Sequence, residues 1–307
     1  MGALDPAASA ATTPETGWVT TVRAYVSVTK PRIIELLLVT TVPTMILAAQ
    51  GWPDPWVMIA VIVGGALAAG GASTFNNVYD ADIDRLMVRT AHRPMASGAI
   101  SPRAGWIFGS ILSVASVVVL AVFTNWLAAA LGALAIAAYA LGYTVLLKRR
   151  TAQNIVWGGA AGCMPVLIGW AAVSGSLSWT PVILFFVVFW WTPPHYWPLS
   201  LRYRDDYESA GVPMLPVLAP PATVMRHIAA YSALMVLTSW VLIPVAPMGW
   251  VYSVTAIVLG VAFGLEVFRL WRRVKRGAED VAPMRLFHGS ITYLALLFLA
   301  VAIDPFV

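Results

Sequence analysis

The chain has 307 residues, of which 60% are hydrophobic and 11% are charged, and its mean hydropathy is +0.79. Ordinary soluble domains carry about 25% charged residues. This composition therefore excludes that class and indicates a polytopic membrane protein. The formal net charge is +5, and the single cysteine, Cys163, excludes an internal disulfide.

The first segment, residues 1–22, is rich in Ala, Thr, Pro and Gly. It lacks the basic segment and the apolar stretch of a cleavable signal peptide. Because such a segment can bury little apolar surface, we expect a disordered cytoplasmic tail over residues 1–25. One transmembrane domain is expected to follow over residues 26–307.

Nine apolar stretches follow, and each is close to the roughly 20 residues that a helix needs to cross a bilayer. They cover residues 34–49, 56–75, 106–123, 127–147, 155–173, 181–194, 228–245, 251–270 and 286–303. The sixth is short and is interrupted by Pro193 and Pro194. The predicted fold is all-α, with nine transmembrane helices around a central cavity that opens to the cytoplasmic side.

The basic residues test this count of spans, because cytoplasmic loops carry an excess of Lys and Arg. All 19 Lys and Arg residues fall in loops on one side of the predicted bundle. We therefore expect a multi-pass protein of the cell membrane with its N-terminus in the cytoplasm and its C-terminus outside. The positive net charge indicates topology and not nucleic-acid binding.

A first acidic segment, Asn76 to Pro94, closes the second span with the sequence NNVYDADIDRLMVRTAHRP. On a helix, Asn76, Asp80 and Asp84 lie four residues apart and form one stripe, while Asp82 faces the other way. Hard cations such as Mg²⁺ bind oxygen ligands and often share them with substrate phosphate. The stripe predicts a metal and diphosphate site, although carboxylates also gather at a membrane exit simply because water is there.

A second acidic segment, His195 to Pro216, follows the sixth span on the same predicted side. On one helix, His195, Arg202 and Asp206 would lie close to a common line, with Asp205 displaced by one position. Pro198 makes this geometry provisional, since proline can kink or start a helix. Carboxylates on opposite walls could hold two Mg²⁺ ions between them.

Basic residues flank both acidic segments. Lys148 and Arg149 lie where the fifth span begins, and Arg89 and Arg93 follow the carboxylates within the first acidic segment. A basic cluster at this position is also an ordinary topology anchor. Together, however, these side chains could supply the positive charge that a departing diphosphate needs.

Several stretches resemble the intramembrane aromatic prenyltransferases of the UbiA superfamily and, within it, the protoheme IX farnesyltransferases or haem O synthases. The stretches are TKPRIIELLLVTTVPTM, NNVYDADIDRLMVRTAHRP, LKRRTAQNIVWGGAAG and WTPPHYWPLSLRYRDDYESAGVPMLPV. They extend from about Thr29 to Val217, and the resemblance weakens towards the C-terminus.

The resemblance implies that the farnesyl group of farnesyl diphosphate is joined to a vinyl group of haem B, with hydration, to give haem O. It implies a prenyltransferase domain over residues 26–307 and catalytic roles for Asn76, Asp80, Asp84, Asp205 and Asp206. The implied Mg²⁺ ligands are Asp80, Asp84 and Asp206, with Asp205 as the alternative to Asp206. The implied diphosphate-binding residues are Arg89, Arg93, Lys148, Arg149 and Arg202. His195 is the candidate haem contact, and association with haem A synthase is left open.

Three other functions compete with this interpretation. A related prenyltransferase could act on a quinone precursor with the same metal site and another acceptor pocket. A divalent-cation transporter would place its acidic residues near the middle of the bilayer, whereas these clusters lie at one interface. A haem-binding electron carrier would place pairs of histidines within the spans, and the four histidines of this chain are scattered.

Overall fold

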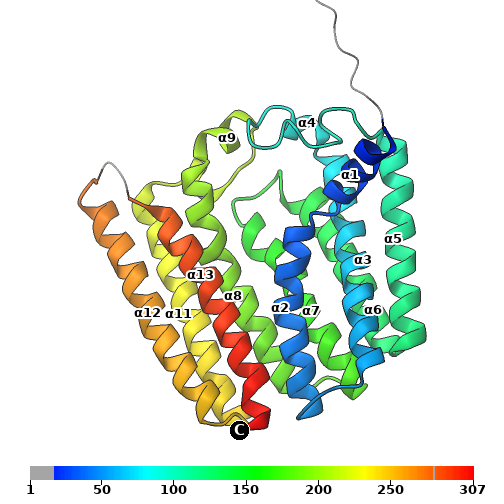
Figure 1. The fold of residues 1–307 in the computed structure, drawn as a ribbon. Helices are drawn as coiled ribbons and strands as arrows, with labels where there is room; N and C mark the ends of the chain where they lie inside the picture. Colours follow the sequence, from blue (N-terminus) through cyan, green and yellow to red (C-terminus); the bar gives the residue numbers. More distant parts are fainter. Residues whose placement is uncertain (1–16, 279–280) are drawn as a thin grey trace, which may run out of the picture.

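The computed structural model describes residues 17–278 and 281–307, and for residues 32–37 it describes the backbone alone. Over these ranges the chain folds into a bundle of long helices (Figure 1). The long helices are α2 (Pro31–Ala49), α3 (Pro55–Tyr79), α5 (Pro102–Phe123), α6 (Trp126–Ala137) with its π-helical continuation η1 (Ala138–Leu147), α7 (Asn154–Ser174), α8 (Trp179–Arg202), α11 (Pro221–Val245), α12 (Trp250–Lys275) and α13 (Pro283–Ile303). The short helices are α1 (Trp18–Val28), α4 (Ala81–Asp84), α9 (Arg204–Ser209), α10 (Leu215–Leu218) and η2 (Asp304–Phe306).

The all-α, multi-pass architecture is confirmed, but the number of spans is supported only in part. Within the described ranges, seven helices are long and apolar enough to cross a membrane. The first and sixth predicted spans fall on α2 and α8. Of α2 only Leu38–Ala49 qualifies, as a shorter apolar helix, and α8 contains Pro193, Pro194 and Pro198. Nine spans around a cytoplasmic cavity therefore stay a prediction.

Small residues bring α3 and α5 into close contact. A Cβ atom on Gly71 of α3 would lie 2.5 Å from the Ser113 hydroxyl oxygen and 3.0 Å from the Gly109 carbonyl oxygen of α5. The hydroxyl of Ser116 donates a 2.7 Å hydrogen bond to the carbonyl of Gly64 across the same interface. Close backbone approach through small residues is typical of helix pairs in membranes, and here it fixes the helix that carries the first acidic segment.

The predicted disordered tail differs in part from the structure. Residues 1–16 lie outside the described residues, but the chain is helical from Trp18 onward as α1. The physical reason is the spacing of its apolar residues, because one face packs Tyr25 against Phe108 with ring centroids 4.9 Å apart. The carbonyl of Val28 then accepts hydrogen bonds from Ser73 and Asn77 of α3, at 2.9 and 3.2 Å. This contact joins the end of α1 to the helix of the first acidic segment.

The C-terminal turn closes the far end of the bundle. The buried carboxylate of Asp304 accepts hydrogen bonds from the backbone N–H groups of Gly249 and Tyr252, the latter at 2.9 Å. These groups belong to the start of α12, where backbone donors have no partner within the helix. Asp304 thus caps α12 from a position more than fifty residues later in the chain.

Candidate active site

The first acidic segment keeps its helical spacing across the junction of α3 and α4. The backbone N–H of Asp80 donates to the Asn76 carbonyl at 2.9 Å, and that of Asp84 donates to the Asp80 carbonyl at 2.8 Å. Asp80 and Asp84 are both 0% exposed, whereas the side chain of Asp82 is 63% exposed. The Asn76 amide donates a 2.6 Å hydrogen bond to the Asp80 carboxylate. The stripe of Asn76, Asp80 and Asp84 is therefore present and turned inward, as its spacing predicts.

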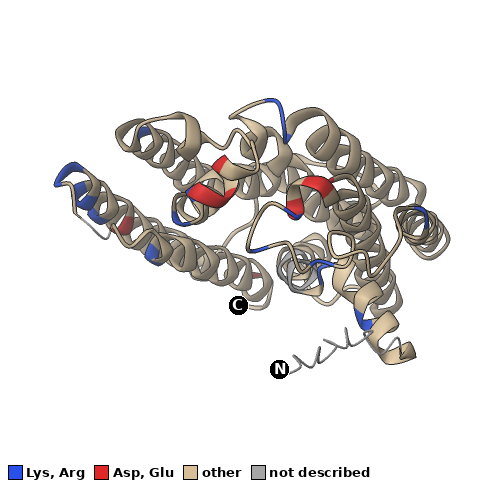
Figure 2. Ribbon diagram, turned by 90° about the horizontal axis from the view of Figure 1, so that it is seen from above, with Lys and Arg blue, Asp and Glu red and all other residues tan. Residues whose placement is uncertain are grey.

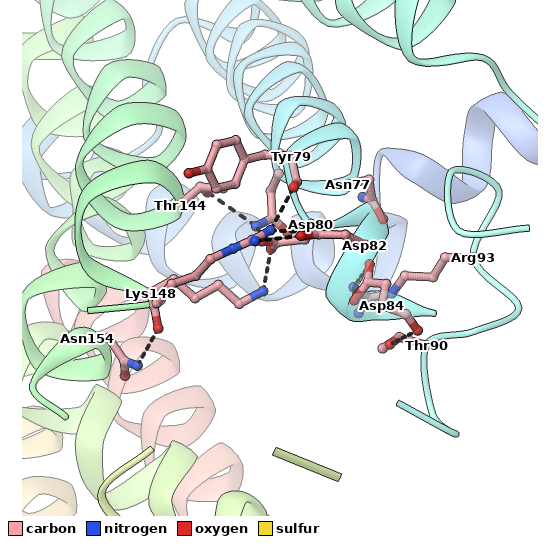
Figure 3. Close-up of polar contacts among 12 residues, drawn as sticks. Asn77, Tyr79, Asp80, Asp82, Asp84, Thr90, Arg93, Thr144, Lys148 and Asn154 are labelled. Carbon is pink, nitrogen blue, oxygen red and sulfur yellow. Dashed lines mark hydrogen bonds and ion pairs between the residues drawn. The ribbon is translucent and has the colours of Figure 1, made fainter. Parts of the chain in front are cut away.

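A second stripe, on η1 and the residue that follows it, faces the first. The Asn76 amide donates to the Thr144 hydroxyl at 3.2 Å, and the Lys148 ammonium forms an ion pair with Asp80 (Figure 3). The Lys148 N–H donates to the Tyr143 carbonyl at 2.8 Å, which is the five-residue spacing of a π-helix. π-helical turns are rare and often occur at functional sites. No signal in the sequence identified this one.

Arg149 joins two carboxylates of the first acidic segment. Its guanidinium donates to Asp82 at 2.6 and 2.7 Å and to Asp80 at 3.3 Å. The same group donates to the Tyr79 carbonyl at 2.8 Å and lies 4.8 Å from the centre of the Tyr79 ring. The hydrogen bonds from Arg149 lower the pKa of Asp82. Arg149 is thus held at the boundary between the buried carboxylate and the exposed one.

Asp84 has its own cationic partner. One terminal nitrogen of Arg93, Nη1, donates to both oxygens of the Asp84 carboxylate, at 2.8 and 3.0 Å. The hydroxyl of Thr90 donates to the Asp84 backbone carbonyl at 3.0 Å. The loop after α4 therefore folds back over this carboxylate and brings Arg93 to it, while diphosphate binding by Arg93 stays a prediction.

Lys30 is a further site residue that was not among the predicted ones. Its ammonium donates a 2.9 Å hydrogen bond to the Asn76 side-chain oxygen. Burial, with the nearby charges of Arg93 and Lys148, lowers the pKa of Lys30 to about 7. Its φ of 53° places it in the left-handed region, although a residue before proline usually adopts an extended conformation. The only available signal was its place in the family-like TKPRI stretch.

The second acidic segment lies at the same end of the bundle as the first. Viewed from above, its red segment faces that of the first acidic segment across the middle of the bundle (Figure 2). Asp206 is half-buried, whereas Asp205 and Arg202 are exposed. The expectation of one continuous helix from His195 to Asp206 is wrong, because α8 ends at Arg202 and α9 begins at Arg204. The break comes at Tyr203, beyond the prolines, so the predicted common line does not reach Asp206.

Arg89 contacts tyrosines of the second acidic segment. Its guanidinium donates a 2.8 Å hydrogen bond to the Tyr207 hydroxyl and lies 5.0 Å from the centre of the Tyr203 ring. It differs in this from Arg93 and Arg149, whose partners are carboxylates.

His195 lies between two aromatic rings. Its ring centroid is 4.2 Å from that of Trp191 and 4.6 Å from that of Phe287, and both pairs are stacked. Its Nδ1 atom is 2.8 Å from the Ser290 hydroxyl oxygen. The packing of α8 against α13 therefore fixes both the position and the rotation of the imidazole.

The donor set fits Mg²⁺ that is shared with a substrate phosphate. In the part of the chain that is described, no three His, Cys, Asp or Glu side chains gather into a complete metal site. Mg²⁺, however, is usually held by one or two carboxylates plus substrate phosphates. Asp80 and Asp84 are buried carboxylates that already require positive partners, and their oxygens are ligands of the kind that Mg²⁺ prefers.

Comparison with known proteins identifies the family. A profile of the UbiA prenyltransferase family matches residues 37–301 of the chain. The chain belongs to the UbiA prenyltransferase family. Proteins named protoheme IX farnesyltransferase from Leifsonia xyli subsp. xyli and Kineococcus radiotolerans are 58% and 55% identical to it. The alignments cover 92% of this chain in both cases, and 92% and 88% of those relatives. The resemblance predicted from the sequence motifs is therefore confirmed.

Solved structures support the same fold for this UbiA family member. A UbiA homologue from Archaeoglobus fulgidus, bound to DMAPP and Mg²⁺, superposes with a TM-score of 0.65 at 16% identity. The superposition covers 92% of this chain and 99% of that one. At this identity the likeness shows the fold alone, and it agrees with the all-helical bundle of Figure 1.

Proposed function

We propose that this UbiA prenyltransferase transfers the farnesyl group of farnesyl diphosphate to a vinyl group of haem B and so forms haem O. The observation that carries the proposal is the buried stripe of Asn76, Asp80 and Asp84, which is met by the cationic groups of Lys148 and Arg93. The names of the relatives that are more than 50% identical support haem as the acceptor.

Diphosphate recognition is assigned to the cations around the first acidic segment. Lys148, Arg149 and Arg93 surround the buried carboxylates, and Lys30 reaches the same amide as Asp80. Mg²⁺ held by Asp80, Asp84 and Asp206 would, when bound, neutralise much of the diphosphate charge. The Mg²⁺ bound to the Archaeoglobus fulgidus homologue supports this metal for the present chain. We assign the third carboxylate to Asp206 because Asp205 is exposed.

The reaction needs charge stabilisation and no protein nucleophile. The bond between farnesyl C1 and the diphosphate oxygen breaks, and the diphosphate leaves with the electron pair. The terminal vinyl carbon of haem B bonds to C1, and water adds to the neighbouring carbon and loses a proton. The cationic side chains stabilise the negative charge that develops on the leaving group, which lowers the barrier to ionisation.

His195 is the proposed contact for the porphyrin. The Ser290 hydroxyl donates a 2.6 Å hydrogen bond to the Phe287 carbonyl, so its oxygen accepts a hydrogen bond from the N–H at His195 Nδ1. The hydrogen-bond network thereby assigns the neutral ring a lone pair on Nε2. A neutral imidazole fixed between two aromatic rings suits haem as a ligand or a hydrogen-bond acceptor.

The proposed setting is the cell membrane, with the N-terminus and both acidic segments on the cytoplasmic side. There the farnesyl chain can lie among the helices while the diphosphate meets the charged residues. The product would pass to the enzyme that consumes haem O, and we include an association with haem A synthase in the proposal.

The test is conversion of haem B to haem O by purified protein in lipid nanodiscs with Mg²⁺ and farnesyl diphosphate. Asp80→Asn and Asp84→Asn are expected to abolish turnover while the protein still inserts. Asp54→Asn is the matched control, because Asp54 caps the opposite end of α3 through Trp56 and asparagine is an equally good cap. Retained turnover in both site variants would overturn the metal site. Prenylation of 4-hydroxybenzoate without prenylation of haem would favour the quinone-precursor alternative.

A further inference from the structure

Arg89 contacts Tyr203 and Tyr207 of the second acidic segment, and Tyr207 in turn contacts Tyr196. Its guanidinium carbon lies 5.0 Å from the centre of the Tyr203 ring and 5.4 Å from that of Tyr207. One terminal nitrogen donates a 2.8 Å hydrogen bond to the Tyr207 hydroxyl. That hydroxyl in turn lies 2.9 Å from the Tyr196 hydroxyl oxygen. One arginine of the first acidic segment is thereby joined to α8 and α9.

Apolar packing joins the same two segments. Tyr207 is buried in a cluster with Ile83 and Met87 from the first acidic segment and with Met214 from the loop after α9. Arg89 therefore lies at the edge of a shared core, and its Nε atom is buried without a hydrogen-bond partner. Loss of the guanidinium would remove the hydrogen bond that holds the Tyr207 hydroxyl from the side of the first acidic segment.

The chemistry of these contacts favours a structural task over diphosphate binding. A guanidinium binds phosphate by presenting its N–H groups in a planar fork. In Arg89 one terminal nitrogen is used by Tyr207, and two aromatic rings lie near the group. The Tyr207 hydroxyl accepts this hydrogen bond and lies 2.9 Å from the Tyr196 hydroxyl, so the guanidinium nitrogen is held within a network of tyrosines. Arg93 and Arg149 instead pair with carboxylates, which a bound metal and diphosphate can replace as partners.

We propose that Arg89 is a positioning residue that fixes α9, and with it Asp206, opposite Asp80 and Asp84. Asp206 immediately precedes Tyr207, so the contact that holds Tyr207 also sets where the Asp206 side chain begins. The assignment replaces diphosphate binding for Arg89. It rests on the proposed function only for the role of Asp206.

The first measurement needs neither metal nor substrate. Hydrogen exchange of the peptide that covers residues 203–214 is followed in substrate-free protein in nanodiscs. Arg89→Ala and Tyr207→Phe are expected to speed exchange in this peptide, because each removes the same hydrogen bond. Arg89→Lys, which keeps a cation near the rings, is expected to restore part of the protection. Arg204→Ala, which removes an exposed arginine of α9 itself, is the matched control and leaves exchange unchanged.

The second measurement separates positioning from binding. Arg89→Ala is expected to lower kcat and to raise the Mg²⁺ concentration for half-maximal rate, with the KM for farnesyl diphosphate changed by less than about threefold. The double variant Arg89→Ala, Tyr207→Phe is expected to be close in rate to Arg89→Ala alone, because both changes break the hydrogen bond that joins the two acidic segments. The further contact that Tyr207→Phe removes, to Tyr196, lies within the second acidic segment. Tyr207→Phe keeps the ring and the packing, so it tests the contact even where Arg89→Ala folds poorly.

Two results would overturn the assignment. One is unchanged exchange over residues 203–214 in Arg89→Ala and Tyr207→Phe. The other is a rise of about tenfold or more in the KM for farnesyl diphosphate with kcat preserved, which is the signature of lost substrate binding. Failure of the proposed function is a separate outcome, because prenylation of another acceptor would leave the exchange result intact.

Discussion

The Lys148 ammonium pairs with the Asp80 carboxylate in a buried environment. The Lys148 side chain is 10% exposed and that of Asp80 is 0% exposed. The buried amide of Asn154 donates a 3.0 Å hydrogen bond to the Lys148 carbonyl and holds that backbone in place. Removal of one partner from a buried ion pair strongly destabilises the fold, because the other charge stays buried without compensation. Any ligand that takes over one partner must therefore satisfy the other as well, as a diphosphate with its metal ion can.

Replacement of Lys148 is expected to reduce catalysis strongly. Lys148→Met keeps the length of the side chain and removes the charge, and we expect a loss of about 100-fold or more in kcat, as for other removed charge-stabilising donors. The measurement is haem O formation by chromatography. Arg150→Ala is the control, since Arg150 is a neighbouring but exposed cation, and its rate is expected to stay within about twofold. Equal losses in both variants would point to the general loss of positive charge.

Breaking the pair of Arg93 and Asp84 is expected to destabilise the protein. Arg93→Ala leaves the Asp84 carboxylate, whose side chain is 1% exposed, without its cationic partner. Loss of one partner of a buried ion pair costs about 3–5 kcal/mol. The melting temperature in detergent is expected to fall more for Arg93→Ala than for the double variant Arg93→Ala, Asp84→Asn, in which no charge is stranded. A double variant less stable than Arg93→Ala would contradict the stranded charge as the cause.

Replacement of His195 is expected to weaken the acceptor side of the site alone. His195→Ala should raise the KM for haem B by about tenfold, the scale of one lost contact of about 1.4 kcal/mol, with the KM for farnesyl diphosphate unchanged. Spectral titration with haem B gives an independent measure of binding. His288→Ala is the control, because His288 is exposed on α13. Equal haem affinity in both variants would show that His195 does not contribute to haem binding.

The stability of the substrate-free protein is expected to rise with pH because of Lys30. Its pKa falls from the ordinary 10.5 to about 7 in the folded state. Below pH 7 the ammonium is protonated in both states, and its burial destabilises the fold. Between the two values the unfolded chain binds a proton that the folded chain has released, so stability increases with pH. Melting temperatures from pH 7 to pH 10 should rise more in the wild type than in Lys30→Met. Parallel plots of melting temperature against pH for the two proteins would exclude Lys30 as the cause of the rise.

Sequence periodicity predicted the first acidic segment well because its geometry is local. Asn76, Asp80 and Asp84 share a face wherever the backbone keeps helical spacing, and their hydrogen bonds show that it does. The same argument failed for the line from His195 to Asp206. The helix breaks at Tyr203, so the residues of α9 no longer continue the face of α8. Hydrophobic periodicity does not predict such a break.

Contacts between distant segments could not be predicted from the pattern of one chain. Lys30 is separated from Asn76 by 46 residues, and Arg89 from Tyr207 by 118. Arg89 was predicted to bind diphosphate because of its charge, whereas in the structure it contacts Tyr203 and Tyr207. The sequence also did not predict the π-helix η1. A membrane helix is apolar on every face, so a change from helical to π-helical spacing produces no distinct hydrophobic pattern.

The cap that Asp304 places on α12 has a consequence for the order of synthesis. The backbone N–H groups at the start of α12 are made more than fifty residues before the carboxylate that binds them. Until η2 has been made, these groups lack the carboxylate that binds them in the folded protein. The cap on α12 is therefore completed only once residue 304 has been made, and a chain that ends before it would leave the start of α12 without this carboxylate.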